Sequence, residues 1–216
     1  KADRGNYFSR FAKKIGGLFN GASHGKKDVA ANNERPIFIP KNILLSAYTD
    51  VGLAEEKVAP AVNAHKRAGE VLNNLVQDLM SNKQFTIEDI QTVVEDVVGS
   101  MVRNPDAMMW VTRLRTQDEL LYGHGLQVAV YLVALGRHLG LPKEFLEHLC
   151  TTGLLLDIGK IRLPKDMLLK KGHLTPEEFE TVKTHVQLGL SILKETSGLH
   201  ADVLQGIAQH HERENG

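Results

Sequence analysis

Apolar residues recur every three to four positions along most of the chain after residue 40, and this period predicts an all-α fold. It places one apolar stripe along each helix, and no stretch alternates as a half-buried strand would. The segments that carry the pattern are 61–80, 86–101, 106–114, 118–139, 143–158, 175–193 and 201–211. No strand–helix–strand rhythm accompanies them, so we expect a helical bundle.

Local signals mark several helix boundaries. Asn104 precedes Pro105, and a residue before proline avoids the helical region, so a helix should break there. Gly140, with Pro142 beyond it, is typical of a helix end. The segment 175–178 reads Thr-Pro-Glu-Glu, which supplies a capping hydroxyl, a proline at the first helical position and a carboxylate that reaches the cap amide.

The first 35 residues differ in composition, with eight Lys and Arg against three acidic residues. Phe8, Phe11 and Ile15 fall at helical spacing, so this segment could lie on an anionic membrane or be a linker helix on its own domain. We expect the linker helix, because the glycines at 16, 17 and 21 shorten any helix. Residues 21–35 are polar and rich in Gly, Asn and Lys, as linkers are.

Composition narrows the function classes. Of the 216 residues, 26 are Lys or Arg and 26 are Asp or Glu, so no net field favours a nucleic acid polymer. The single cysteine, Cys150, excludes a disulfide framework and a cysteine zinc site. No apolar run approaches the roughly 20 residues of a spanning helix, and we expect a cytoplasmic protein. Because the sequence starts at Lys1, we also expect an interior piece of a longer protein.

Five polar residues at or near apolar helix faces are candidates for a metal site: His124, Asp157, His185, His210 and His211. A carboxylate entering a core is costly unless a cation receives it, and Asp157 ends the apolar run 153–156. Imidazoles combined with carboxylates suit Mn, Fe or Zn. A lone histidine on an apolar face is more often an ordinary core or surface residue. We assign His138, His148, His173 and His200 to that ordinary class.

The sequence resembles the HD-GYP family from about residue 104 to the end. The motifs that carry the resemblance are Asp157-Ile158-Gly159-Lys160, the segment 171–178 and His210-His211-Glu212-Arg213. Members of this family are metal-dependent phosphodiesterases of the HD superfamily that hydrolyse the bacterial second messenger cyclic di-GMP. The resemblance implies three regions: a basic segment and linker over 1–40, a helical lead-in over 41–103, and an HD-GYP-like domain over 104–216 that is incomplete at its C-terminal end.

The resemblance also implies roles for the residues that match the family's motifs. His124, Asp157, His185 and the pair His210-His211 match metal ligands, with Asp157 bridging two ions. Lys160 matches the lysine that contacts substrate phosphate and has a catalytic role, as Asp157 does, and we expect Arg213 to bind substrate as well. The expected cofactor is one or two divalent transition metal ions, Fe or Mn in preference to Zn, with incomplete occupancy open.

Four departures from the family pattern bear on the expected activity. Leu156 stands where the family has the histidine before the bridging aspartate, and leucine offers no ligand atom. Leu120 stands where some members place a carboxylate for a third metal. The chain also stops at Gly216, before the Gly-Tyr-Pro loop and the later ligand aspartate, and Asn215 replaces an acid. We expect Gly216 to border a mobile loop.

Three functions remain open on the sequence alone. The first is an active cyclic di-GMP phosphodiesterase, and the second a degenerate member that binds cyclic di-GMP or a protein partner. Leu156 favours reduced or lost activity, because losing a ligand disables metal chemistry. A different HD-type nucleotide phosphohydrolase fits the candidate ligands but not the segment 171–178. Other signalling proteins and a homodimer stay open as partners.

Overall fold

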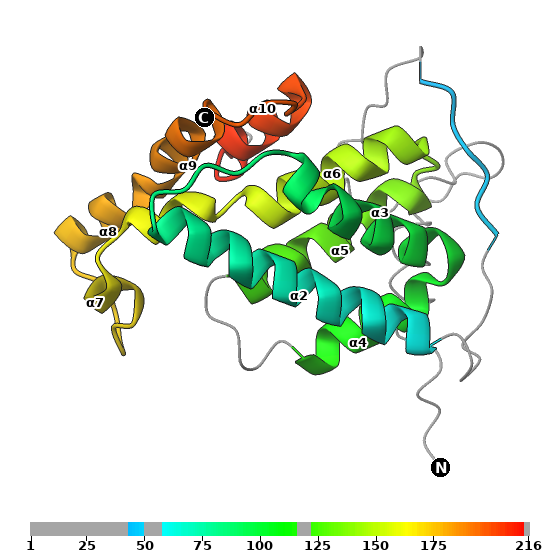
Figure 1. Ribbon diagram of the computed structural model, residues 1–216, viewed down its shortest axis with the longest axis horizontal. Helices are drawn as coiled ribbons and strands as arrows, with labels where there is room; N and C mark the ends of the chain where they lie inside the picture. Colours follow the sequence, from blue (N-terminus) through cyan, green and yellow to red (C-terminus); the bar gives the residue numbers. More distant parts are fainter. Residues whose placement is uncertain (1–42, 50–57, 116–121, 214–216) are drawn as a thin grey trace, which may run out of the picture. The chain divides into compact units, whose positions relative to one another are not determined.

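The computed structural model describes residues 43–49, 58–115 and 122–213, and its contacts divide the chain into Lys1–Ile43 and Leu44–Gly216. The second unit holds the helices in Figure 1. The longer helices are α2 (Val58–Met80), α3 (Glu88–Arg103), α4 (Pro105–Arg115), α5 (Tyr122–His138) and α6 (Lys143–Leu155). They are followed by the 3₁₀ helix η2 (Ile158–Arg162), α7 (Lys165–Leu168), α8 (Pro176–Lys183), α9 (His185–Leu193) and α10 (Ala201–Gln209). No strand occurs in the described ranges, which confirms the all-α class.

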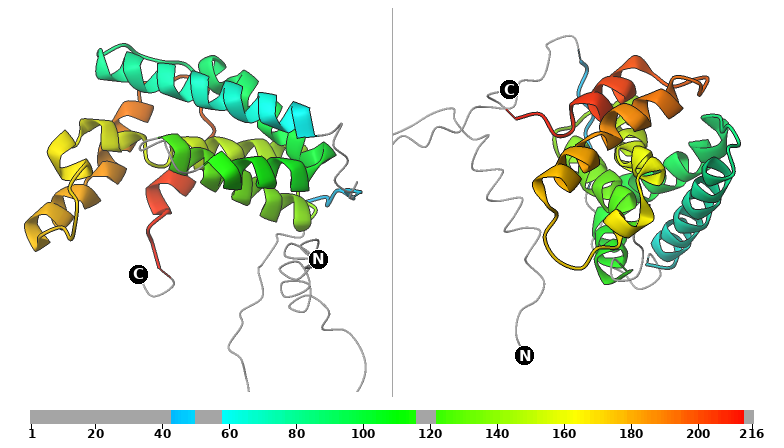
Figure 2. Two further views of the ribbon diagram at one scale, coloured as in Figure 1. Left: turned by 90° about the horizontal axis from the view of Figure 1, so that it is seen from below. Right: turned by 90° about the vertical axis from the view of Figure 1, so that its left-hand side faces the viewer.

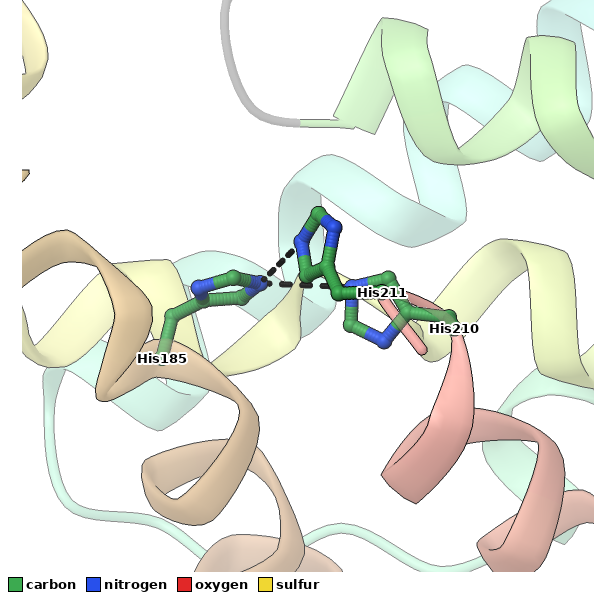
Figure 3. A group of neighbouring side chains, drawn as sticks. All are labelled: His185, His210 and His211. Atoms are coloured by element: carbon green, nitrogen blue, oxygen red, sulfur yellow. Dashed lines mark hydrogen bonds between the residues drawn. The ribbon is translucent and has the colours of Figure 1, made fainter. Parts of the chain in front are cut away.

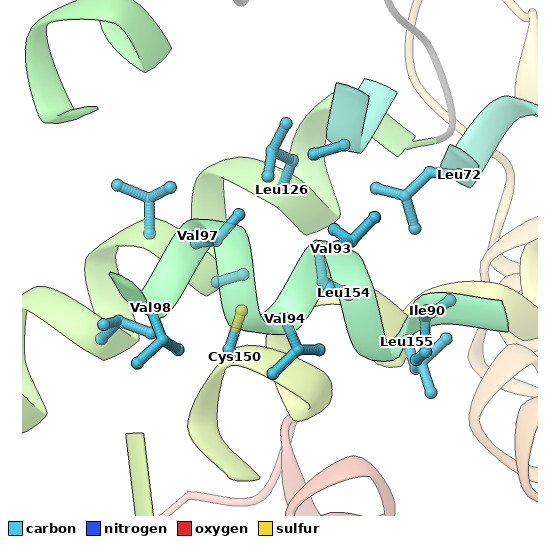
Figure 4. Close-up of a cluster of buried hydrophobic side chains, with 14 of the residues drawn as sticks. Leu72, Ile90, Val93, Val94, Val97, Val98, Leu126, Cys150, Leu154 and Leu155 are labelled. Carbon is cyan, nitrogen blue, oxygen red and sulfur yellow. The ribbon is translucent and has the colours of Figure 1, made fainter. Parts of the chain in front are cut away.

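The centre of the core is α3. Its apolar stripe is buried against α2, α5 and α6 and consists of Ile90, Val93, Val94, Val97, Val98 and Met101. Figure 4 labels the first five of these residues. These are the positions that the 3.6-residue period selects, so the hydrophobic pattern alone places this helix correctly. Leu154 and Leu155 at the end of α6 belong to the same buried cluster. The core therefore anchors the chain immediately before Asp157.

The helices α5 and α6 lie side by side and carry the approach to the site. A Cβ at Gly153 would come within 2.4 Å of the Ala129 Cα atom, so only glycine allows this spacing. The same kind of contact joins η2 to α9, where Gly159 lies against Gly189. These close backbone contacts fix α6 and η2 against the helices that carry His124 and His185.

Two helices differ from the sequence prediction: one ends earlier, and the other is divided into two helices. The helix predicted over 143–158 ends at Leu155, because Asp157 leaves the α-conformation (φ −100°, ψ 7°) and the chain tightens into η2. The helix predicted over 175–193 is divided at Thr184 into α8 and α9. There the Thr184 hydroxyl and amide both donate to the Thr181 carbonyl, which competes with continued α-helical bonding.

The other predicted boundaries lie within a few residues of the observed ones, as helix ends usually do. The Asn104–Pro105 break separates α3 from α4, with the Asn104 side chain accepting the Ala107 amide 3.2 Å away. Thr175 and Glu178 form the predicted capping box at α8. The start expected near residue 118 and the basic segment 1–40 lie outside the described residues. Of the described helices, none combines the length and apolarity that crossing a membrane requires.

Candidate metal centre

The expected metal ligands come from four different helical segments and meet beside Asp157. His124 is in the first turn of α5, and Asp157 lies between α6 and η2. His185 begins α9, and His210 with His211 follows α10 directly. Residues up to 87 positions apart in the sequence are thus brought together by the packing of α9 on η2 and of α10 on α6 and α9.

The three C-terminal imidazoles converge on one point. The Nε2 atom of His185 lies 3.3 Å from Nε2 of His210 and 3.3 Å from Nε2 of His211, as Figure 3 shows. Each of the three rings offers a ligand atom, and these atoms lie within 4.8 Å of one another. His185 is buried, His210 half-buried and His211 exposed, so the group is open to solvent on one side.

Two of these rings are oriented by carbonyls from the last turn of a helix. The Nδ1 of His185 lies 2.6 Å from the Val182 carbonyl of α8, and the Nδ1 of His210 lies 2.7 Å from the Ile207 carbonyl of α10. Such terminal carbonyls lack intrahelical partners, so each receives the ring's Nδ1–H. This tautomer leaves the Nε2 lone pair free, which is the orientation found in metal-ligating histidines.

A cation fits this arrangement better than the protein atoms alone. Both Nδ1 atoms lie against carbonyls, and the Nε2 atoms of His185 and His210 face each other at 3.3 Å, so two imidazoles without a second proton would meet there as two acceptors. Burial lowers the pKa of His185, and burial followed by the neighbouring His210 lowers that of His211, so both rings favour the neutral form. Neutral imidazole is the form that binds metal.

Asp157 completes the cluster as a buried carboxylate. Its side chain is 6% exposed, and Oδ1 lies 3.4 Å from His185 Nε2. Its Oδ2 accepts a 2.7 Å bond from Lys160 Nζ and lies 3.8 Å from His124 Nε2. The bond to Lys160 follows from the 3₁₀ geometry of η2, in which side chains three residues apart stand on the same side.

The sequence pattern missed some residues that set this geometry. The phosphate contact expected of Lys160 stays a prediction. The bond that Lys160 donates to Asp157 was not predicted, although the spacing of three residues could have indicated it. The carbonyls of Val182 and Ile207 had no sequence signal, since every residue has a carbonyl. Arg213 is exposed, His124 has a side chain that is 58% exposed, and Leu120 lies outside the described residues.

Leu156 occupies the position between the core and the site. It is 6% exposed, yet it is not part of the connected hydrophobic core that includes Leu154 and Leu155. Its backbone amide continues the helix by bonding to the Thr152 carbonyl at 2.9 Å. The side chain therefore contributes apolar surface next to Asp157 and no donor or acceptor atom.

Comparison with known proteins places this cluster in a family. The family model described as an HD domain matches residues 109–216, and HD domains are metal-dependent. A cyclic di-GMP phosphodiesterase of Pseudomonas aeruginosa is 32% identical over 162 residues, which cover 75% of this chain and 39% of the relative. A cyclic di-GMP phosphodiesterase of Thermotoga maritima is 39% identical over 83 residues, 38% of this chain and 23% of the relative.

A third relative, a probable cyclic di-GMP phosphodiesterase of Vibrio cholerae serotype O1, is 29% identical over 161 residues, 67% of this chain and 36% of the relative. The chain thus spans between 23% and 39% of the length of these three relatives. No solved structure matches the chain. The helical fold, the matched region and these relatives together confirm the resemblance read from the motifs, and the chain belongs to the HD domain family as a domain of the HD-GYP type.

Proposed function

We propose that this chain hydrolyses cyclic di-GMP as a metal-dependent phosphodiesterase, with activity reduced by Leu156. The observation that carries the proposal is the convergence of three imidazole Nε2 atoms beside the buried carboxylate of Asp157. The printed names of the relatives from Pseudomonas, Thermotoga and Vibrio supply the substrate class. Cytoplasmic location is part of the same proposal.

In this proposal His185, His210, His211 and Asp157 hold a divalent ion, and His124 completes the ligand set from the open side. Fe or Mn suits this mixture of nitrogen and oxygen donors, since none of the five proposed ligands offers the sulfur atom that a softer ion prefers. When bound, the ion supplies Lewis acidity to a phosphoryl oxygen. The carbonyls of Val182 and Ile207 hold two of the rings so that little reorganisation accompanies binding.

Lys160 has two roles in the proposal, one for each state of the site. Its Nζ neutralises Asp157 in the metal-free arrangement, at 2.7 Å from Oδ2. Once the carboxylate is shared with a divalent ion, the lysine charge is available for a phosphate oxygen that gains charge during hydrolysis. Its side chain is 28% exposed, so a substrate can reach it from solvent. Arg213 is exposed, follows His211 by two positions in the sequence and is proposed to bind the second phosphate.

Leu156 favours a second candidate function, a binding module for cyclic di-GMP or for another signalling protein. A buried leucine beside Asp157 cannot contribute to a second metal position, so a two-metal site would lack a ligand. A binding module needs the recognition groups Lys160 and Arg213 but not turnover. A homodimer is compatible with either function.

The test measures metal content and cyclic di-GMP hydrolysis of the same preparation, after loading with Fe²⁺ or Mn²⁺ under reducing, anaerobic conditions. We expect slow, metal-dependent turnover that Asp157→Asn abolishes and that His173→Asn, a change at an exposed histidine outside the cluster, leaves unchanged. Binding without turnover in the loaded protein would favour the binding module. Because two relatives of Vibrio cholerae are named 3'3'-cGAMP-specific phosphodiesterases, that dinucleotide is the competing substrate.

A further inference from the structure

A second group of potential ligands lies at the opposite end of α10 from His210. It consists of His148 on α6, His200 at the N-cap of α10 and Asp202 in the first turn of α10. The ligand atoms of the three residues lie within 4.8 Å of one another. Since α10 has nine residues and a helix rises about 1.5 Å per residue, the group is roughly 13 Å from the cluster at Asp157.

The buried Nδ1 atom of His148 is the strongest indication that this group binds a ligand. This atom has no hydrogen-bond partner among the described residues. A buried polar atom without a partner is uncommon in folded proteins, and an unrecorded water or ion often explains one. The ring of His148 stacks on that of His200 with centroids 4.2 Å apart and planes inclined by 16°.

The other two residues present further acceptors to the same place. The Nδ1 of His200 accepts the Asp202 amide at 3.2 Å, so this nitrogen carries a lone pair and not a proton. The Asp202 carboxylate lies 3.5 Å from the same Nδ1. Two nitrogen ligands and one carboxylate therefore gather at a site where, among the described residues, the Asp202 amide donates a hydrogen bond.

We propose that His148, His200 and Asp202 form a second binding site for a divalent transition metal, separate from the centre at Asp157. Two imidazoles and a carboxylate, with water in the remaining position, are a donor set that Zn²⁺ accepts. This proposal replaces the expectation that His148 and His200 are ordinary core or surface histidines. It goes beyond the proposed hydrolysis, because none of its residues takes part in the cluster at Asp157.

Binding at this site requires a change of ring orientation. The in-plane lone pairs of stacked rings run parallel and cannot meet at one ion, so His200 must turn out of the stack. Its side chain is 52% exposed and that of Asp202 59% exposed, which leaves room for both to rotate. Turning His200 breaks one capping hydrogen bond, which weakens binding by about tenfold relative to a preformed site.

A metal ion bound at the second site would link α6 to the N-terminal end of α10. The helix α6 leads to Asp157, and α10 leads to His210, so an ion at the second site restrains two segments that carry ligands of the first. Because the ion binds only the folded chain, it raises the melting temperature in a concentration-dependent way. A metal ion at the second site therefore holds together the two helices that position ligands of the main centre.

The experiment titrates tag-free protein with ZnCl₂ and measures bound zinc per chain, together with the melting temperature. The background is His185→Ala/His211→Ala, which removes two ligands of the main centre and isolates the second site. In that background we expect about one zinc ion per chain and a rise in melting temperature with added zinc. Adding His200→Asn should abolish both, because asparagine keeps an N-cap acceptor but lacks the imidazole.

Two further variants make the result decisive. Asp202→Asn changes an exposed carboxylate without removing the cap, and it should weaken zinc binding at least tenfold. His173→Asn, at an exposed histidine in neither group, should bind zinc as the background does. Circular dichroism verifies that each variant is folded. If the His200→Asn and Asp202→Asn proteins bind as much zinc as the His173→Asn protein, the second site does not exist, whatever the outcome at the main centre.

Discussion

A single methyl group at Gly159 should disrupt the metal centre without changing any ligand. A Cβ on this residue would lie 1.9 Å from the His185 carbonyl oxygen, 2.4 Å from the Gly189 amide nitrogen and 2.9 Å from the Gly189 Cα. All three are backbone atoms, so no side-chain rotation relieves the overlap. The substitution Gly159→Ala therefore forces η2 and α9 apart.

The size of the displacement follows from these distances. Cβ contacts shorter than 3.0 Å are essentially absent from proteins, so the contact with the His185 carbonyl must lengthen by about 1.1 Å. Asp157 and His185 flank this contact, and their ligand atoms are 3.4 Å apart. Metal–ligand distances tolerate only about 0.2 Å. A displacement of this size should weaken metal binding by about 100-fold, and overpacking should lower the free energy of unfolding by about 1–3 kcal/mol.

The matched control is Gly189→Ala, on the other side of the same contact. A Cβ there would lie 3.3 Å from the Gly159 nitrogen and 3.5 Å from an Ile158 methyl, so a shift of a few tenths of an ångström suffices. Metal affinity is measured by competition with a chromophoric chelator, and stability by urea unfolding of the metal-free protein. Equal metal affinities for the two alanine variants would refute the argument that backbone contact at Gly159 sets the distance between Asp157 and His185.

Three further predictions concern single side chains. Leu156→His should raise metal occupancy in elemental analysis, whereas Leu156→Ala should not, because only the imidazole adds a ligand. Thr175→Ala should lower the free energy of unfolding by about 0.5–2 kcal/mol in urea titration, since the hydroxyl caps α8 through the Glu178 amide. The pKa of Glu178 is lowered by hydrogen bonds from Lys170 and then the Thr175 amide, so its stabilising contribution is present at neutral pH and is lost as the pH falls below its ordinary value of about 4. Glu178→Gln should therefore destabilise the chain at pH 7, and the difference from the unmodified chain should shrink as the pH falls through the lowered pKa of Glu178.

The helices could be predicted because the sequence signals that define them lie within short stretches of the chain. The stripe of α3 and the capping box at Thr175 depend on residues within one or two turns of each other, and both are present as predicted. The division at Thr184 and the tightening at Asp157 could not be read from periodicity. Each depends on which carbonyl a particular amide or hydroxyl selects, and the apolar spacing continues through both positions.

The sequence predicts which residues are candidates for the site, but it does not predict how they are arranged. The residue types and the resemblance to a family pointed to His124, Asp157, His185, His210 and His211. The bond between Lys160 and Asp157, the carbonyls that orient two rings and the glycine contact at η2 depend on tertiary packing. The stacking of His148 on His200 also depends on tertiary packing, because the two residues are 52 positions apart in the sequence. Neither residue carries a sequence signal that distinguishes it from an ordinary histidine.

Leu156 shows how the fold separates stability from chemistry at this point of the chain. Leu154 and Leu155 belong to the connected core, and Asp157 faces the histidines, so the change from core to site takes place across one residue. Leu156 is as buried as Leu154, at 6% exposure, but it lies outside that connected core. The rings of His185 and His210 are oriented by carbonyls of α8 and α10, and neither contact involves the side chain at position 156. The consequence is that the orientation of these imidazoles beside Asp157 is set by α8 and α10 and not by the side chain at position 156.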